Sequence, residues 1–207
     1  MTLSEAIKTR RSVGSFKSNP ISDEIIEEML ESARLAPSGG NAQNYTFGII
    51  RDESLKTQLA QAAGNQMWIA SAPVVIAGCG DISWDIKDPP EDDFGLIVNY
   101  LRFGKDFVNT MKEYPDRRAL MKLWHNGSPV IAMEHMFLTA VSHGLSACFI
   151  GYLDVDRASE ILSLPDNLAC LFLLPVGYTD EISGPKTRKS IDDISFHNRW
   201  DSLTTTQ

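Results

Sequence analysis

The sequence predicts an α+β fold in which helices flank a mixed sheet. Two strand, helix, strand units point to this class, one over residues 45–79 and one over residues 145–177. A third observation is the helix expected at residues 129–143, which is apolar on nearly all sides and therefore belongs in the middle of the molecule. With 207 residues, 43% of them hydrophobic, the chain is long enough to bury its core as a single domain, residues 1–207.

The first two elements are predicted to be helices. Thr2 and Glu5 have the spacing of a capping box, so a short helix should run to about Arg10. Ser22 opens a longer helix whose apolar residues share one face, and Pro37 forces its end. Both helices are therefore followed by polar segments, one rich in Arg and one rich in Gly and amide side chains.

Strands are expected at one alternating stretch, residues 45–50, and at three more continuously apolar stretches. These three stretches are residues 72–79, 145–150 and 168–177. Asp154 is predicted to cap a helix between the last two strands.

The middle of the chain, residues 81–127, reads as a variable helical cover. Its acidic start, residues 81–93, lacks the ligand spacing of a calcium loop, so we expect a solvated loop and no metal site. The remainder has a helical pattern and suggests two helices broken near the sequence YPD. Ser128 should then cap the apolar helix with Pro129 in its first turn, and Gly144 should stop it.

Charge and composition narrow the class of protein. The net charge of -8 argues against a nucleic-acid or anionic-membrane partner, since such partners need clustered Lys and Arg. The N-terminus lacks a secretory signal and no apolar run is long enough to span a membrane, so we expect a cytoplasmic protein. Cys79, Cys148 and Cys170 lie in apolar runs without CxxC spacing, and we expect buried free thiols.

Several familiar catalytic devices are missing from the sequence. It contains no GxxxxGK[ST], no HExxH and no GxSxG, and GCGDIS offers only GxG after a strand. The four histidines never fall at helical ligand spacing, so we expect core or surface roles for them and no metal. These histidines are His125, His135, His143 and His197.

What remains is a set of anion and amide donors at three places in the chain. Arg10, Arg11 and Ser12 follow the first helix, four polar side chains lie in the loop after the second, and Lys186 and Arg188 follow the last strand. Converging cations suit a phosphate, and amide donors over an apolar platform suit a heterocycle rimmed with carbonyls and ring nitrogens. Taken singly, each group also has an ordinary explanation. Arg10 and Arg11 can interact with a helix dipole, the stretch PSGG can be a loop that ends a helix, and the stretch KTRK can lie on a solvated surface.

Five elements occur in a fixed order and together cover most of the chain outside about residues 81–127. They are RRSVGSF (10–16), APSGGNAQ (36–43), AMEHMFLTAVSHGLSACFIGYLD (132–154), LPVGYTD (174–180) and PKTR (185–188). This combination resembles the nitroreductase-like family of flavin mononucleotide (FMN) oxidoreductases. The resemblance implies a nitroreductase-like three-layer α/β/α sandwich with a mixed, mainly antiparallel sheet, and a homodimer with FMN sites at the subunit interface.

The resemblance also implies which residues hold the cofactor phosphate. Arg10 and Ser12, with Arg11 close by, would meet the FMN phosphate and ribityl chain. Lys186 and Arg188 would hold the phosphate from the other side.

Further residues would face the flavin ring or its ribityl arm. A loop of the partner subunit would supply Pro37, Ser38, Gly39, Asn41 and Gln43. Gln66 would lie near the pyrimidine edge of the ring. Ile150 and Gly151 would lie beside flavin N5, the atom that accepts hydride, where a backbone N–H donates a hydrogen bond.

One position departs from the family pattern. Where the family usually has Arg or Lys two positions after the Ser, this chain has Gly14. A cation there would stabilise the negative charge that develops at flavin N1 and O2 on reduction. Either the backbone N–H of Gly14 or another cation substitutes, or the reduced flavin is less stabilised here.

The resemblance predicts an FMN-dependent oxidoreductase that takes hydride from NADH or NADPH and passes it to a nitroaromatic, quinone or enone in ping-pong order. A flavin-binding dimer without turnover, acting as a sensor or carrier, stays open as an alternative, as does a reductive dehalogenase of the same fold. Candidates for the acceptor site are Phe94, Phe103, Phe107 and Trp124, although core positions are the ordinary alternative for them. Residues 189–207 are expected to form a C-terminal arm that wraps the neighbouring subunit.

Overall fold

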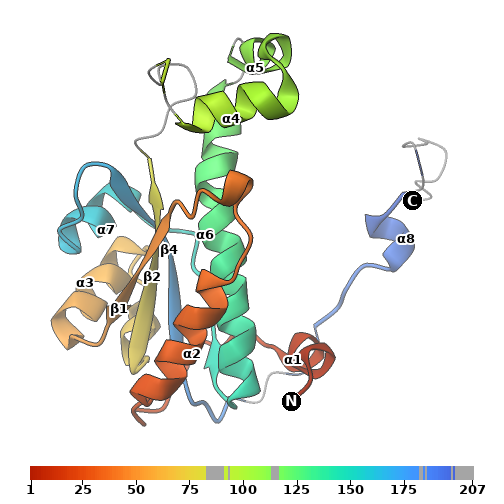
Figure 1. Ribbon diagram of the computed structural model, residues 1–207. Helices are drawn as coiled ribbons and strands as arrows, with labels where there is room; N and C mark the ends of the chain where they lie inside the picture. The colour runs from red at the N-terminus through yellow and green to blue at the C-terminus, as the bar shows by residue number, and fades with distance from the viewer. Residues whose placement is uncertain are drawn as a thin grey trace.

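The computed structural model describes residues 1–82, 91–92, 94–112, 117–181, 184, 186–196 and 198. Four strands form one sheet, and helices cover both of its faces (Figure 1). The strands are β1 (Tyr45–Ile50), β2 (Val74–Asp81), β3 (Ser146–Ala147) and β4 (Leu168–Gly177). The helices are α1 (Leu3–Thr9), α2 (Asp23–Arg34), α3 (Glu53–Ala62), α4 (Phe94–Phe103), α5 (Lys105–Lys112), α6 (Arg117–Ser142), α7 (Val155–Ile161) and α8 (Ile191–Ile194), with short 3-10 helices η1 (Gly39–Asn41) and η2 (Met67–Ser71).

The sheet has the strand order β1-β2-β4-β3, and each of its ladders is antiparallel. The mainly antiparallel sheet is confirmed; within the described part of the chain its mixed character is limited to one parallel bridge, Ser12 to Ala147. The two predicted strand, helix, strand units are not crossovers between parallel strands, because β1 pairs with β2 and β3 pairs with β4 in antiparallel ladders. Ile50 at the end of β1 pairs with Val75 at the start of β2, so the intervening chain begins and ends at the same end of the sheet.

Two cores lie on opposite faces of the sheet. Val74 and Ile76 of β2 pack in the core that α2 and α6 cover, whereas Val75 and Ala77 pack in the core that α3 and α7 cover. Successive strand residues point to opposite faces, and both faces are covered, which explains why β2 is almost entirely apolar. The three-layer α/β/α sandwich is therefore confirmed (Figure 1).

Helix α6 is longer than the sequence pattern indicated. It runs through Ser128 and Pro129, so the prediction that Ser128 caps a new helix is wrong. A proline inside a helix removes one backbone hydrogen bond, and here the packing of the following turns outweighs that loss. Met133 occupies the space where a Cβ at Gly78 would lie, so the helix approaches β2 closely. Gly144, with φ 75°, follows the helix end as predicted.

Strand β3 is shorter than the predicted strand at residues 145–150. The Cys148 N–H donates to the Pro175 carbonyl at 3.3 Å, but Pro175 has no N–H with which to return the bond. Pairing with β4 resumes only as an isolated bridge between Ile150 and Leu173. Residues 148–150 therefore form an irregular edge, and this edge belongs to the predicted site.

The starts of three helices agree with the predictions, although the Ser22 side chain makes no capping hydrogen bond. The Thr2 hydroxyl accepts from Glu5 N–H in a capping box, and α1 ends at Thr9 with Arg10 as its C-cap. Helix α2 begins after Ser22 as predicted and ends at Arg34, shortly before Pro37. Asp154 caps α7 by accepting from the Arg157 N–H at 3.1 Å.

The described part of the predicted cover contains a break that the sequence pattern did not indicate. Gly104, at φ 81°, separates α4 from α5. The expected break near YPD and most of the acidic loop, residues 83–90, lie outside the described residues. In Figure 1, α4 and α5 extend beyond the end of the sheet.

Phe103 and Phe107 form an aromatic pair on this cover. Their ring centroids are 6.1 Å apart, and the two residues are 57% and 55% exposed. The core alternative for these two side chains is therefore wrong. The side chains of Phe94 and Trp124 lie outside the described residues.

The C-terminal segment leaves the body of the molecule. Helix α8 lies apart from the sheet and its covering helices in Figure 1, and its apolar residues Ile191 and Ile194 are exposed.

Cys79 and Cys170 are buried free thiols as predicted, whereas Cys148 is only partly buried. Among the described residues, no helix has both the length and the apolar character needed to cross a membrane.

Candidate functional site

The turn that follows α1 is the centre of the candidate site. The Arg11 guanidinium donates to two carbonyls of its own turn at 2.8 and 2.9 Å and to the Gly184 carbonyl at 3.3 Å. The last contact brings the start of the second basic segment against the end of α1. Lys186 and Arg188 follow in that segment with exposed side chains. Two of the three predicted donor groups are thus neighbours in the fold.

Arg10 is held on the inner side of the same turn. Its guanidinium carbon lies 5.1 Å from the centroid of the Phe137 ring, and its Nη1 lies 3.5 Å from the Ser12 hydroxyl. Ser12 in turn forms the parallel bridge to Ala147. This bridge places the turn beside the irregular edge that leads to residues 150–151.

A carboxylate lies within this group of cations and hydroxyls. The Gly14 N–H donates to Glu181 Oε2 at 3.0 Å. Burial raises the pKa of the neighbouring Cys148 thiol; the Ser12 side chain and the Arg10 charge oppose this shift, and the Glu181 charge adds to it. Arg10, Ser12 and Glu181 therefore share one neighbourhood.

The two backbone positions predicted beside the flavin differ in what they can donate. The Ile150 N–H donates to the Leu173 carbonyl at 2.9 Å, and Leu173 returns a bond of 3.1 Å. The Gly151 N–H makes no hydrogen bond to any described residue. Of the pair, only Gly151 can offer its N–H to a ligand.

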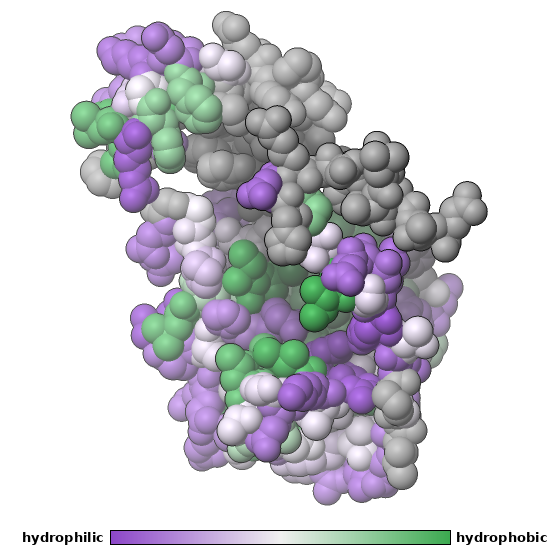
Figure 2. Space-filling view, turned by 90° about the vertical axis from the view of Figure 1, so that its right-hand side faces the viewer, coloured by the Kyte–Doolittle hydropathy of each residue, from purple (hydrophilic) through white to green (hydrophobic). Residues whose placement is uncertain are grey.

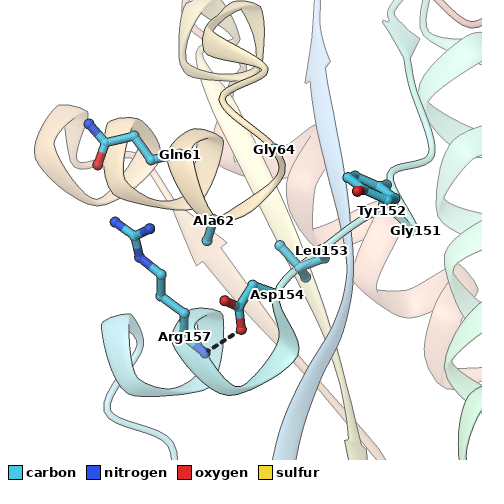
Figure 3. Close-up of a pocket in the computed structure, with 8 residues that line it drawn as sticks. All are labelled: Gln61, Ala62, Gly64, Gly151, Tyr152, Leu153, Asp154 and Arg157. Atoms are coloured by element: carbon cyan, nitrogen blue, oxygen red, sulfur yellow. Dashed lines mark hydrogen bonds between the residues drawn. The ribbon is translucent and has the colours of Figure 1, made fainter.

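Gly151 also lines an open hollow of about 460 Å³ (Figure 3). The Gln61 and Arg157 side chains lie on one side of it and the Tyr152 ring on the other. Asp154 also lines it, but its carboxylate already accepts the Arg157 backbone N–H. No sequence motif indicated this hollow.

The segment of η2 packs against the residues that follow the turn after α1. Trp68 stacks on Phe16 with ring centroids 6.5 Å apart, and a Cβ at Gly14 would lie 3.8 Å from Trp68. Gln66, at the start of η2, donates from its amide to the Ala63 carbonyl at 2.6 Å. Sequence reasoning missed Trp68, because a single aromatic residue in an apolar stretch is ordinarily a core residue.

The amide loop between α2 and β1 is shaped by its own hydrogen bonds. The Gln43 N–H donates to the Ser38 hydroxyl at 3.0 Å, and the Gln43 amide donates to the Asn41 carbonyl at 3.4 Å. Asn41 and Gln43 have φ values of 59° and 49°, in the left-handed region that Asn tolerates better than most residues. Pro37, Gly39, Asn41 and Gln43 are exposed.

Within one chain, the amide loop lies far from the other predicted site residues. Tyr45, which follows the loop, pairs with Gly80 near the end of β2, whereas Gly177, close to Phe16, lies beside the start of β2. The eight residues of β2 span roughly 25 Å. The loop and the turn after α1 therefore lie at opposite ends of the sheet (Figure 1).

Two histidines on α6 contact α2. His135 Nδ1 lies 3.1 Å from the Ser32 carbonyl, and His143 Nε2 lies 2.8 Å from the Glu28 carboxylate. These contacts join two helices of one layer and account for both side chains structurally.

Comparison with known proteins relates the fold to a family. Residues 7–178 match the model of the Nitroreductase family. The chain is 26% identical over 196 residues to an NADH dehydrogenase of Thermus thermophilus, covering 89% of this chain and 90% of that protein. It is also 26% identical over 202 residues to the FMN reductase (NADPH) of Bacillus subtilis, covering 97% and 75% of the two chains.

Solved structures give the same result. Nitroreductase A from Vibrio parahaemolyticus is 25% identical, with a TM-score of 0.76 over 98% of this chain and 78% of that one. NfrA2 of B. megaterium, at 23% identity, shares the fold with a TM-score of 0.77 over 99% and 78%. Since the family match covers most of the 207 residues and the fold agrees, the chain belongs to the nitroreductase family.

Proposed function

We propose that this protein is an FMN-dependent oxidoreductase that takes hydride from NADH or NADPH and passes it to a small oxidised acceptor. The observation that carries the proposal is the Arg11 contact with Gly184, which brings the start of the segment that carries Lys186 and Arg188 against the end of α1. Relatives named FMN reductase (NADPH) and NADH dehydrogenase support both the flavin and the nicotinamide donor.

The residues at this end of the sheet fit FMN. Arg10 and Arg11 supply planar guanidinium groups that suit a phosphate, and both are already held by local contacts. The Gly14 N–H already binds a carboxylate, so this turn accepts an anionic oxygen. The Gly151 N–H, which has no partner among the described residues, offers a directional donor to the ring.

FMN, when bound, supplies the chemistry of accepting and returning hydride. The protein's part is to bind and orient. Arg10, Arg11 and Ser12 would fix the phosphate end, with Lys186 and Arg188 closing over it. Gly151 would fix the ring through its N–H, and Gln66 would lie near the pyrimidine edge. No side chain needs to act as a nucleophile, because position and local field are sufficient.

The amide loop would complete the site of the partner subunit in a homodimer. Within one chain this loop lies far from the turn after α1, residues 10–14, which we call the basic turn (Figure 1). The distance supports this arrangement, because the loop cannot reach the basic turn of its own chain; its residues are Pro37, Ser38, Gly39, Asn41 and Gln43.

Exposed apolar side chains offer a surface through which two copies could associate. Leu3 and Ile7 of α1 and Ile131 of α6 are 67%, 56% and 42% exposed, and a hollow of about 350 Å³ lies between α1, α2 and α6. Figure 2 shows apolar patches among polar ones on the side of the molecule where α1 lies. A second copy would cover them, since a paired surface removes apolar area from water.

We further propose one FMN-binding domain over residues 1–207, with residues 189–207 as an arm on the partner. The exposed Ile191, Ile194 and Phe196 support the arm. The exposed Phe103 and Phe107 pair supports an acceptor site near the variable segment 94–124. The acceptor's identity and a cytoplasmic location stay predictions from the sequence.

The test is reconstitution with FMN followed by anaerobic titration with NADH and with NADPH. We expect a yellow protein with the absorbance band of oxidised flavin at about 450 nm. Reduction by the nicotinamide should abolish this band, and a quinone or nitroaromatic should restore it. Protein that binds no FMN would contradict the proposal. A second candidate, a flavin-binding dimer without turnover, is favoured by the carboxylate at Gly14; it would bind FMN and show no bleaching with either nicotinamide.

A further inference from the structure

Glu181 holds its carboxylate against the basic turn by a defined set of contacts. Its Oε2 accepts the Gly14 N–H at 3.0 Å, and its own N–H donates to the Thr179 hydroxyl at 2.9 Å. The Thr179 hydroxyl donates to the Ser15 carbonyl at 2.7 Å. These bonds join the turn after β4 to the segment after α1, so the position of the carboxylate is built into the fold.

Position 14 contributes no side chain beside this carboxylate. A Cβ at Gly14 would meet only Trp68, at an ordinary contact distance of 3.8 Å, and the φ of Gly14 lies outside the left-handed region. Neither space nor backbone conformation therefore requires a glycine there. What the glycine changes is charge, since its N–H faces a carboxylate and it contributes no cation.

We propose that Glu181 is an internal anion that competes with FMN for the basic turn, so that the flavin is held exchangeably. The inference rests on the proposed FMN site. Arg10 and Ser12, the residues proposed to bind the FMN phosphate, share the neighbourhood of the Glu181 carboxylate around Cys148. A negative charge there repels an incoming phosphate dianion, and it already occupies the Gly14 N–H, a donor of the same turn.

Titration of the apoprotein with FMN and with riboflavin, followed by flavin fluorescence, tests the inference. Glu181→Gln removes the charge and keeps the shape of the side chain. We expect it to lower the FMN dissociation constant about tenfold and to slow FMN release, with less than about a twofold effect on riboflavin, which has no phosphate. Asp180→Asn is the matched control, because its carboxylate pairs with Lys17 on the surface at 2.6 Å.

Three results would overturn the inference. They are an unchanged FMN dissociation constant in Glu181→Gln, an equal effect of Asp180→Asn, and equal tightening of FMN and riboflavin. If Glu181→Gln fails to fold by circular dichroism, Glu181→Ala serves instead and carries the same expectation. Wild-type protein that binds no flavin overturns the proposed function as well, whereas wild-type binding without a Glu181 effect overturns this inference alone.

Discussion

The Nε of Arg11 donates to the carbonyl of Gly184 at 3.3 Å, across 173 positions of sequence. The same guanidinium donates to two carbonyls at the end of α1, so one side chain bridges an early turn and a late basic segment. A delocalised guanidinium with several donors can do this and still carry a full charge for a phosphate.

Arg11→Ala should therefore weaken FMN binding about tenfold or more, because it removes a cation and releases the segment that carries Lys186. The measurement is the FMN dissociation constant from flavin fluorescence. Arg51→Ala is the matched control, since Arg51 pairs with Asp23 on the surface at 2.6 Å. Equal FMN affinity in the two variants would contradict the role of Arg11.

Substitutions at Gly151 separate the backbone donor from the side-chain space. Gly151→Ala should be tolerated, because a Cβ there meets Phe172 at an ordinary 3.5 Å. Gly151→Pro removes the N–H, and we expect hydride transfer from the nicotinamide to slow by about a hundredfold while FMN still binds. Stopped-flow reduction of both variants gives the rates. Equal rates would show that this N–H does not serve the flavin.

The amide of Asn41 is best tested with a variant that tolerates the left-handed backbone conformation at this position. Asn41→Gly removes the amide and keeps the φ of 59° accessible, whereas Asn41→Ala also adds a strain of about 1–2 kcal/mol. We expect both to weaken FMN retention, and only the Ala variant to lower the melting temperature. Calorimetry together with fluorescence separates the two effects. Retention of FMN at the wild-type level by Asn41→Gly would remove the amide from the site.

Local patterns predicted much of the fold. The capping box at Thr2, the helix start at Ser22 and the cap at Asp154 each depend on a few neighbouring residues, and each agrees with the structure. The predictions failed where contacts between residues far apart in the sequence determine where a helix begins or a strand ends. Pro129 lies inside a helix because later turns of α6 pack on β2, and β3 stops early because Pro175 on another strand lacks an N–H.

In the candidate site, too, residues with a local sequence pattern could be predicted and residues that depend on distant contacts could not. The basic residues near Arg10 and Lys186 could be singled out from residue type, and the structure brings their two segments together. Glu181 could not, because one acidic residue in a polar segment carries no pattern. Its relation to Gly14 exists only through the pairing of two turns far apart in sequence. Likewise, the sequence could not tell that the Ile150 N–H is already bonded within the sheet.

We expect each FMN site to combine the basic turn of one subunit with the amide loop of the other. Mixed dimers of Arg11→Ala and Asn41→Gly, carrying different affinity tags, test it most directly. One of their two sites pairs an intact turn with an intact loop, and the other has both defects. We predict that the purified heterodimer binds one FMN per dimer with wild-type affinity, although each variant homodimer binds weakly. A heterodimer that binds FMN no better than the two homodimers would contradict the claim.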